Sequence, residues 1–401
     1  MAAEDGTAMR DASAPERRGK PLTVLELAPP PGHGGSERAL HETAAALVRS
    51  GARVVIAAAE TPSALRLRAT GASLAALDLD TRSPLRIRSN ARAVAALARA
   101  EGADLIHARS AAAAAAGLRA AEETGAAFVT TWSEPDEAGM LARPLFDALA
   151  AGAPVIAPSD HVAAHLREAR GLGPDRVVTI PRGADMAGFA EEAVSPMRAL
   201  RMAEALGLAE DARPLILSPG RIAPGKGRRL LVRALARLKA ERGADFTAII
   251  VGEGEGAQAR LIEAEIAAAR AGDVIRLAGP AADMPAALML SALVVAPATE
   301  PQLSARILLE AQAMGRPVIA ADHGAARESL RHGASGWLFP PGDEAALAAA
   351  LSAALDLDES GRAHMAMAGR ALVRSRFRLE DTIARTLEVY EAAASGARSA
   401  A

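Results

Sequence analysis

Short runs of β-branched and other apolar residues alternate along the chain with longer stretches of helical period. This alternation is typical of βαβ units, in which helices join parallel strands. Helical stretches such as Glu37–Ser50 and Ala91–Glu101 are each followed by a glycine, as helix ends often are. In the first half, the pattern predicts strands at Leu22–Ala28, Val54–Ala58, Leu105–Ala108, Ala127–Thr131, Val155–Pro158 and Val177–Ile180.

The segment Pro181–Pro196 interrupts this alternation with two prolines and two glycines, and we interpret it as a linker. The alternation then predicts strands at Leu215–Pro219, Thr247–Val251, Val274–Ala278, Leu293–Ala296 and Pro317–Ala321. We therefore expect an α/β protein with two Rossmann-like domains, residues 21–185 and 186–375, facing each other across a cleft. Within residues 376–401, a last helix at Leu379–Ala394 is expected to pack back across the hinge.

Composition narrows the choice of protein class. Half of the 401 residues are hydrophobic but only 2% are aromatic, which predicts cores of closely packed small side chains. The net charge of −2 argues against nucleic-acid binding, and the absence of cysteine excludes disulfides and thiolate chemistry. Residues 1–20 have no apolar core, so we expect a disordered tail rather than a signal peptide. With no apolar window of membrane-spanning length, these features favour a cytoplasmic location.

The first candidate site is the glycine-containing loop Pro30–Glu37, between the first predicted strand and the first helix. Glycines let the backbone approach a ligand, and the free N–H groups at a helix start bind anions. The same residues fit a flexible turn with Ser36 as the helix N-cap, and the sequence leaves both readings open. The spacing of a dinucleotide fingerprint is absent.

The second candidate site is the loop Ser218–Gly227, in which Arg221 and Lys226 precede a helix. Lys226 lies between two glycines and is one of only three lysines in the chain. Two cations together with helix-terminal N–H groups suit a diphosphate, each charged hydrogen bond being worth roughly 1.5–3 kcal/mol. The alternative is a pair of solvated loop cations.

The third candidate site is the segment Thr299–Gly315, a loop that enters a helix carrying Glu310 two turns in. Leucines and an alanine flank Glu310, and burying a carboxylate among them is costly without a partner. The vicinal hydroxyls of a ribose are a suitable partner. An exposed helical glutamate is the alternative.

The chain resembles family 4 retaining glycosyltransferases in the order and spacing of several motifs. The motifs are Gly34–Glu37, Arg221 to Gly227, Glu310–Gly315, Gly336–Phe339, the hinge-like Val178–Asp185 followed by Phe189, Asp283–Pro285 and His323 to Glu328. The resemblance covers about residues 22–378. Two further segments, Pro84–Arg88 and His107–Ser110, are similar to bacterial members that build lipopolysaccharide or related envelope glycans.

The resemblance implies a GT-B fold and metal-independent transfer of a sugar with retention at the anomeric carbon. The donor would be a UDP-type or GDP-type nucleotide sugar, the acceptor an envelope glycan or glycolipid, and no cofactor is implied. The residues assigned to catalysis are Arg221, Lys226, Gln302 and His107, although a structural histidine with satisfied hydrogen bonds is an equal alternative for His107. Those assigned to donor binding are Gly34, Gly35, Gly252, Met284, Leu303, Ser304, Ala305 and Glu310. Glu310 would hold the ribose, and Gly252 and Met284 would lie near the base.

The sequence departs from the family pattern at two places. Gln302 stands where the family usually has a glutamate, and Trp132-Ser133-Glu134 stands where a His-Gly pair is common. An amide can hydrogen-bond sugar hydroxyls but supplies no charge to a cationic transition state. Two alternatives therefore stay open: a nucleotide-sugar 2-epimerase of the same architecture, and a catalytically silent partner subunit.

Two charged segments outside these motifs carry weaker signals. Asp78-Leu79-Asp80 imitates the metal-binding motif of the other glycosyltransferase fold, but it lies on an alternating stretch without a third ligand, so no metal site is expected. A basic run without an intervening acid is either a solvated face or a contact with an anionic membrane surface, on the inner face in the latter case. Its members are Arg82, Arg86, Arg88, Arg92 and Arg99.

Overall fold

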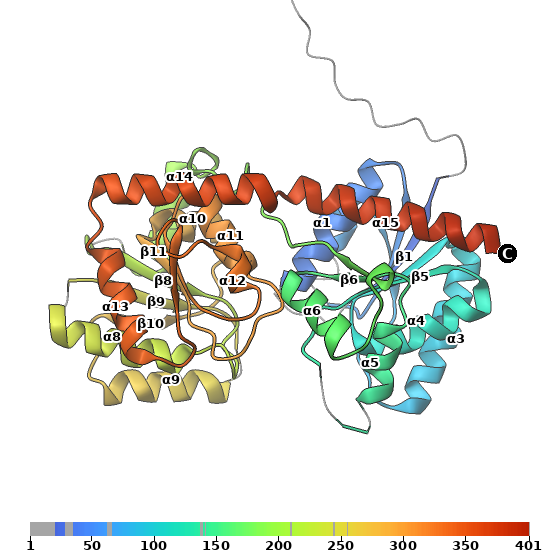
Figure 1. Cartoon of the computed structure of the whole chain (residues 1–401), viewed down its shortest axis with the longest axis horizontal. Coiled ribbons are helices and arrows are strands. Elements are labelled where there is room, and N and C mark those ends of the chain that lie inside the picture. The colour runs from blue at the N-terminus through green and yellow to red at the C-terminus, as the bar shows by residue number, and fades with distance from the viewer. Residues whose placement is uncertain are drawn as a thin grey trace, which may run out of the picture.

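The computed structural model describes residues 21–28, 35–61, 66–136, 139–140, 142–208, 211–243, 245–254 and 256–400. For residues 398–400 it describes the backbone alone. Two α/β domains lie side by side, each built around a parallel sheet (Figure 1). The predicted tail at residues 1–20 and most of the loop Pro30–Glu37 lie outside the described residues.

Among the described residues, the first domain has a seven-stranded sheet with the order β3-β2-β1-β4-β5-β6-β7. Its strands are β1 (Thr23–Leu27), β2 (Arg53–Ala58), β3 (Ser73–Ala76), β4 (Leu105–Ala108), β5 (Ala127–Thr131), β6 (Val155–Ala157) and β7 (Val177–Thr179). One face packs against α3 (Pro84–Glu101), α4 (Ala111–Thr124), α5 (Arg143–Ala150) and α6 (Asp160–Glu168). The other face packs against α1 (Gly35–Arg49) and α15 (Leu379–Ala400). Short 3-10 turns lie at Leu67–Thr70 and Pro174–Arg176.

The described part of the second domain has a six-stranded sheet with the order β10-β9-β8-β11-β12-β13. Its strands are β8 (Leu215–Pro219), β9 (Thr247–Val251), β10 (Ile275–Ala278), β11 (Leu293–Ala296), β12 (Val318–Ala321) and β13 (Gly336–Phe339). One face packs against α8 (Arg228–Arg242), α9 (Gly256–Ala268) and α13 (Glu344–Leu355). The other packs against α7 (Pro196–Ala205), α10 (Met284–Leu290), α11 (Arg306–Ala313), α12 (Ala326–Ser329) and α14 (Glu359–Arg376). A 3-10 turn at Glu191–Ala193 precedes α7.

Both sheets have the doubly wound order of a Rossmann fold, so the predicted fold class is confirmed. The order reverses between β1 and β4 and again between β8 and β11. Ligands of such sheets bind beyond the carboxyl ends of the strands at these switch points. The sequence pattern missed two edge strands, β3 and β13, because neither contains a β-branched residue to signal it.

Small side chains let the helices approach the sheets closely. Gly117 of α4 lies so near β1 that a Cβ atom there would be 2.7 Å from Leu27 Cδ1. The alanines around it are buried, which accounts for the low aromatic content of the core. This close packing holds α4 directly against β1, β4 and β5.

The chain crosses between the domains twice, and the two crossings are hydrogen-bonded to each other. The N–H of Ala184 donates to the Phe377 carbonyl (2.9 Å), and the N–H of Leu379 donates to the Ala184 carbonyl (3.1 Å). A Cβ atom at Gly183 would lie 2.5 Å from the Arg378 carbonyl oxygen, so only glycine permits this approach. Helices α14 and α15 follow each other along one side of both domains (Figure 1). Among the described helices, none has the length and apolar character needed to cross a membrane.

Candidate functional site

Lys226 and Gln302 meet at the switch point of the second sheet. Lys226 follows β8 and Gln302 follows β11, and Lys226 Nζ donates a hydrogen bond to Gln302 Oε1. Gln302 Nε2 donates to the carbonyl of Glu300 at 2.7 Å. The amide of Gln302 therefore has a fixed orientation, with its oxygen toward the lysine.

The glycines on either side of Lys226 are required by close packing of two loops. A Cβ atom at Gly227, which has a φ of +68°, would lie 1.6 Å from the Pro297 carbonyl oxygen. Gly225 also has a positive φ, and its carbonyl accepts a hydrogen bond from the N–H of Thr299 at 2.9 Å. The loop after β8 is thus held on the loop after β11, which fixes the position of Lys226.

The electrostatic environment of Lys226 favours an anion. Burial, together with the charges of Arg221 and Arg228, lowers the pKa of Lys226 to about 8. Arg228 is buried, and its Nη2 donates to the Pro219 carbonyl at 2.8 Å. Arg221 is exposed on the same loop. The surroundings of Lys226 disfavour the protonated form of its amine, and a bound negative group would favour that form again.

The other predicted donor-binding residues lie around this switch point, with two exceptions on the first domain. A Cβ atom at Gly252 would lie 2.0 Å from the Gly220 carbonyl oxygen, so the loops after β8 and β9 touch there. Met284 begins α10, and Leu303 packs against the core of the first domain. Ser304 and Ala305 line a pocket between the domains. Gly34 lies outside the described residues, and Gly35 is the exposed first residue of α1.

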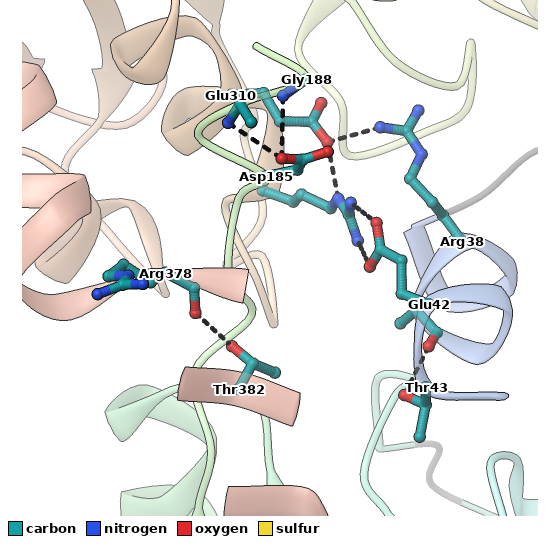
Figure 2. A network of polar contacts seen from close by, with 11 residues as sticks. Arg38, Glu42, Thr43, Asp185, Gly188, Glu310, Arg378 and Thr382 are labelled. Carbon is teal, nitrogen blue, oxygen red and sulfur yellow. Dashed lines mark hydrogen bonds and ion pairs between the residues drawn. The ribbon is translucent and has the colours of Figure 1, made fainter. Parts of the chain in front are cut away.

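Glu310 takes part in an ion network that joins the two domains, shown in Figure 2. Its Oε1 atom accepts from Arg38 Nη1 (2.6 Å) of α1 and from Arg306 Nε (2.7 Å) of α11. Arg306 Nη1 also donates to Glu42 Oε2 of α1 at 2.8 Å. We call these four residues the α1–α11 ion network. The sequence predicted that buried Glu310 needs a partner; in this structure two arginines are partners, and Oε2 has no hydrogen bond to any described residue.

His107 lies in a buried polar cluster of the first domain that also contains Glu26, Arg109 and Tyr390, which we call the Glu26 cluster. Its Nε2 is 2.8 Å from Thr131 Oγ1, and its Nδ1 contacts Tyr390 Oη and Glu26. Burial lowers the pKa of His107, although the Glu26 carboxylate acts in the opposite direction. Burial alone would raise the pKa of Glu26, but Arg109 and His107 hold it well below its usual range. Both ring nitrogens of His107 are occupied here, while its side chain lines an inter-domain pocket.

Comparison with known protein families identifies the class of this chain. A family model described as Glycosyltransferase Family 4 matches residues 33–187, and one described as Glycosyl transferases group 1 matches residues 213–356. Together the two models match most of both domains. The chain belongs to glycosyltransferase family 4.

Similar proteins support this family assignment. A D-inositol 3-phosphate glycosyltransferase of Thermobispora bispora is 35% identical over 225 residues, which are 54% of this chain and 50% of that protein. The chain thus spans about half the length of the curated relatives it matches. A glycosyltransferase structure from Rickettsia africae is 25% identical with a TM-score of 0.83, covering 94% of this chain and 99% of that one. Anabaena Alr3699/HepE in complex with UDP and glucose is 23% identical with a TM-score of 0.80, covering 92% and 100%.

The segment Trp132-Ser133-Glu134, which stands where this family commonly has a His-Gly pair, forms packing and helix-capping contacts. Trp132 is fully buried, with its ring centroid 5.5 Å from that of Phe146. Ser133 Oγ donates to the Arg109 carbonyl, and Glu134 accepts from the N–H of Ala111 at the start of α4. This segment therefore supports the start of α4.

The two discounted charged segments lie together on the surface of the first domain. Asp78 forms an ion pair with Arg86 (2.8 Å), and Arg99 forms one with Glu123 (3.2 Å), so two members of the basic run have acidic partners. The five arginines of the run are all exposed. Within the described residues, histidines and carboxylates form no group of three or more that could hold a metal ion.

Sequence reasoning missed the charged residues that meet between the domains. Arg38 and Glu42 are four residues apart on α1, as Arg306 and Glu310 are on α11. This spacing places each pair on one helix face, a signal that could have been found in the sequence. Nothing local showed that the two faces meet. Glu26 was hidden within an apolar strand pattern.

Proposed function

We propose that the protein transfers a sugar from a nucleotide diphosphate donor to an acceptor bound by its first domain. The observation that carries the proposal is the Lys226 environment at the switch point of the second sheet. There a partly buried amine with a lowered pKa lies beside Arg221 and Arg228, on a loop that two glycines allow to pack closely against the loop after β11. A nucleoside diphosphate supplies the negative charge that this site lacks. The complex of the structurally similar Anabaena Alr3699/HepE with UDP is compatible with such a donor.

In this proposal each predicted residue has a distinct part. Lys226 and Arg221 neutralise the diphosphate as it leaves, which is where negative charge develops in the transition state. Glu310 holds the ribose through Oε2, which the arginines leave open in this structure. Gly252 and Met284 flank the base.

The remaining predicted residues surround the transferred sugar. Leu303, Ser304 and Ala305 lie beside the sugar and phosphate, and Gln302 orients the sugar through its amide. Gly35 is assigned to the opposite wall, together with Gly34, which lies outside the described residues. Both ring nitrogens of His107 already have hydrogen-bond partners, so its proposed role is to form part of the wall of the acceptor pocket.

The proposed reaction retains the configuration at the anomeric carbon and needs no metal. Its transition state has oxocarbenium character, and closing the domains excludes water that would hydrolyse the donor. Cationic side chains replace the metal that other transferases place on the diphosphate. Turnover is therefore expected to continue in excess EDTA. Activity that disappears in EDTA and returns with Mn²⁺ or Mg²⁺ would refute metal independence.

The decisive experiment is nucleotide binding, followed as a rise in melting temperature. UDP or GDP should stabilise the protein, and Lys226→Ala should remove most of the rise, because the charged contacts it loses are worth about 1.5–3 kcal/mol each. Lys239→Ala is the matched control, since Lys239 is a surface lysine of the same domain paired with Asp273. A melting curve unchanged by every common nucleoside diphosphate would contradict the donor-site assignment.

The acceptor in the proposal is an envelope glycan or glycolipid. The resemblance of Pro84–Arg88 and His107–Ser110 to envelope-glycan enzymes supports this class. The names of the relatives point to a rival, because an inositol phosphate is the acceptor that a D-inositol 3-phosphate glycosyltransferase implies. With the donor identified, product analysis on both acceptor classes decides between them. Transfer to inositol phosphate and none to the glycolipid would overturn the envelope assignment.

A catalytically silent role is the second candidate. It is favoured by Gln302 in place of a carboxylate and by half-buried Ser133, which stands where the family often has a histidine. A silent subunit would bind the nucleotide yet neither transfer nor hydrolyse the donor. Slow donor hydrolysis by the purified protein, lost in Lys226→Ala, would exclude this role.

We extend the proposal to peripheral contact with an anionic membrane on the cytoplasmic side. The basic run lies on and just before α3, and Leu85 beside it is 75% exposed. Each arginine near such a surface contributes about 1 kcal/mol. Co-sedimentation with phosphatidylserine vesicles is expected to weaken in salt and in the Arg88→Gln/Arg92→Gln variant. Equal binding to neutral vesicles would refute the electrostatic contact.

A further inference from the structure

Arg182 lies on the first crossing between the domains, and the backbone on both sides of it is fixed. Thr382 Oγ1 donates to the Pro181 carbonyl at 2.8 Å, and Ala184 forms hydrogen bonds with the second crossing. Next to Arg182, Gly183 is pressed against Arg378. Because the backbone is fixed on both sides, the side chain of Arg182 begins from a well-defined position.

Three arginines line an inter-domain pocket, and among the described residues Arg182 is the one of the three without a hydrogen bond or ion pair. Arg109 Nε pairs with Glu26 at 2.8 Å, and Arg306 pairs with Glu42 and Glu310. Arg182 also lines this pocket, yet it forms no hydrogen bond or ion pair with any residue that the structure describes. Burial, together with Arg109 and Arg306, lowers the pKa of Arg182 to about 9.

The carboxylates near Arg182 already have other partners. Glu42 is bound by Arg306, and Glu328 accepts hydrogen bonds from the N–H groups of Asp160 (2.9 Å) and His161 (3.2 Å) at the start of α6. A partly buried cation between two like charges is unfavourable unless an opposite charge joins it. An unfavourable charge that the protein keeps in this way is typical of a binding site whose ligand supplies the opposite charge.

Arg182 lies between the places that the proposed function gives to donor sugar and acceptor. It lines one pocket with Ser304 and Ala305 of the donor loop, and a second pocket with His107 and Thr131 at the ends of β4 and β5. The donor diphosphate is assigned to Lys226 and Arg221, which line neither pocket. A negative group at Arg182 therefore belongs to another part of the reactants.

We propose that Arg182 binds a phosphate or carboxylate of the acceptor, so that the enzyme selects negatively charged acceptors. This inference rests on the proposed function. The unpaired guanidinium, the two flanking arginines and the contact with both pockets carry it. Arg182 is a specificity-determining residue in this scheme, because it contacts the acceptor away from the reacting bond.

Inorganic phosphate is the first probe, titrated into protein saturated with UDP so that the donor loop is occupied. Wild type should show a rise in melting temperature beyond that of chloride at equal ionic strength. Arg182→Gln should lose most of this rise, Arg182→Lys should keep part of it, and Arg119→Gln on the exposed surface of α4 should keep all of it. Without phosphate, Arg182→Gln should melt no lower than wild type, because removing the charge relieves repulsion.

Two results of this titration would overturn the inference: an equal phosphate effect in Arg182→Gln, or a lower melting temperature of that variant without phosphate, which marks a structural role. Binding of UDP is recorded in the same samples. If UDP fails to bind, the proposed donor site fails, while the titration without UDP still reports on Arg182. The two failures are thus distinguishable.

Kinetics then separates the sources of the anion. With an anionic acceptor, Arg182→Gln should raise the acceptor KM about tenfold or more and leave the donor KM unchanged. With a neutral analogue of the same acceptor, wild type and variant should have equal KM values. A raised donor KM confined to donors whose sugar carries a carboxylate would assign the anion to the donor and refute the acceptor assignment.

Discussion

The fixed orientation of the Gln302 amide allows a test of whether this residue reflects a changed donor specificity or a loss of activity. Its oxygen accepts from Lys226 and its nitrogen donates to the Glu300 carbonyl, so Gln302→Glu would place a carboxylate against that carbonyl. We expect the variant to lose activity or to change its donor preference. Gln258→Glu on α9 makes the same chemical change outside the site and serves as the control. A large gain in rate with common nucleotide-sugar donors would instead mean that the wild-type site has decayed.

The lowered pKa of Lys226 predicts a pH dependence of nucleotide affinity. The amine is protonated below pH 8 and loses its charge as the pH rises through about 8, whereas the phosphate, with a second pKa of about 6, is fully ionised there. Affinity should be level between pH 7 and 8 and then fall by up to about tenfold per pH unit.

Calorimetric titration across pH 7–10 checks this, with Lys226→Arg as the comparison. A guanidinium has a higher intrinsic pKa than an amine, so the affinity of that variant should change less with pH than that of wild type. A wild-type affinity that is flat to pH 10 would contradict the assignment of the diphosphate to Lys226.

Helices α1 and α11 are expected to be energetically coupled through their ion network. Arg306 is buried and Glu42 is largely so, and losing one partner leaves the other charge poorly solvated. Glu42→Ala and Arg306→Ala should each destabilise the protein, and the double variant should be less destabilised than the sum by about 1–3 kcal/mol.

Melting temperatures of the four proteins in this double-mutant cycle give the coupling. The exposed pair Arg237–Glu241 on α8 is the control, for which about 0.5 kcal/mol or less is expected. Additive effects at Arg306 and Glu42 would show that the two helices do not depend on this contact for their docking.

The limits of sequence reasoning are also clearest at the level of elements. Strands such as β4, β5, β8 and β9 were predicted at their observed bounds, because buried central strands are short and mostly apolar runs between turn residues. Lys226 and Gln302 were each predicted on a loop before a helix, and the structure brings the two loops together because the adjacent parallel strands β8 and β11 end at one edge. The partners of Glu310 were not foreseen, since they depend on how α1 docks against α11.

At the level of the whole molecule, the double-Rossmann architecture followed from alternation alone, while the arrangement of charge between the domains did not. Arg182 illustrates the difference. Its sequence context marked a hinge, but its lack of a partner among the described residues results from the meeting of two sheets, two crossings and α15. Periodicity determines each domain separately, and the geometry between domains comes from contacts hundreds of residues apart.

The contact of Tyr390 with Glu26 bears on how the protein is made. These residues are 364 positions apart, and Tyr390 Oη donates to Glu26 Oε1 at 2.8 Å in the middle of the first sheet. A ribosome completes the first domain's strands long before it reaches α15, at about 5–20 residues per second. Through that interval the apolar surface that α15 later covers stays open. The first domain to be synthesised is therefore the last to be finished, and it becomes native only after the second domain has been translated.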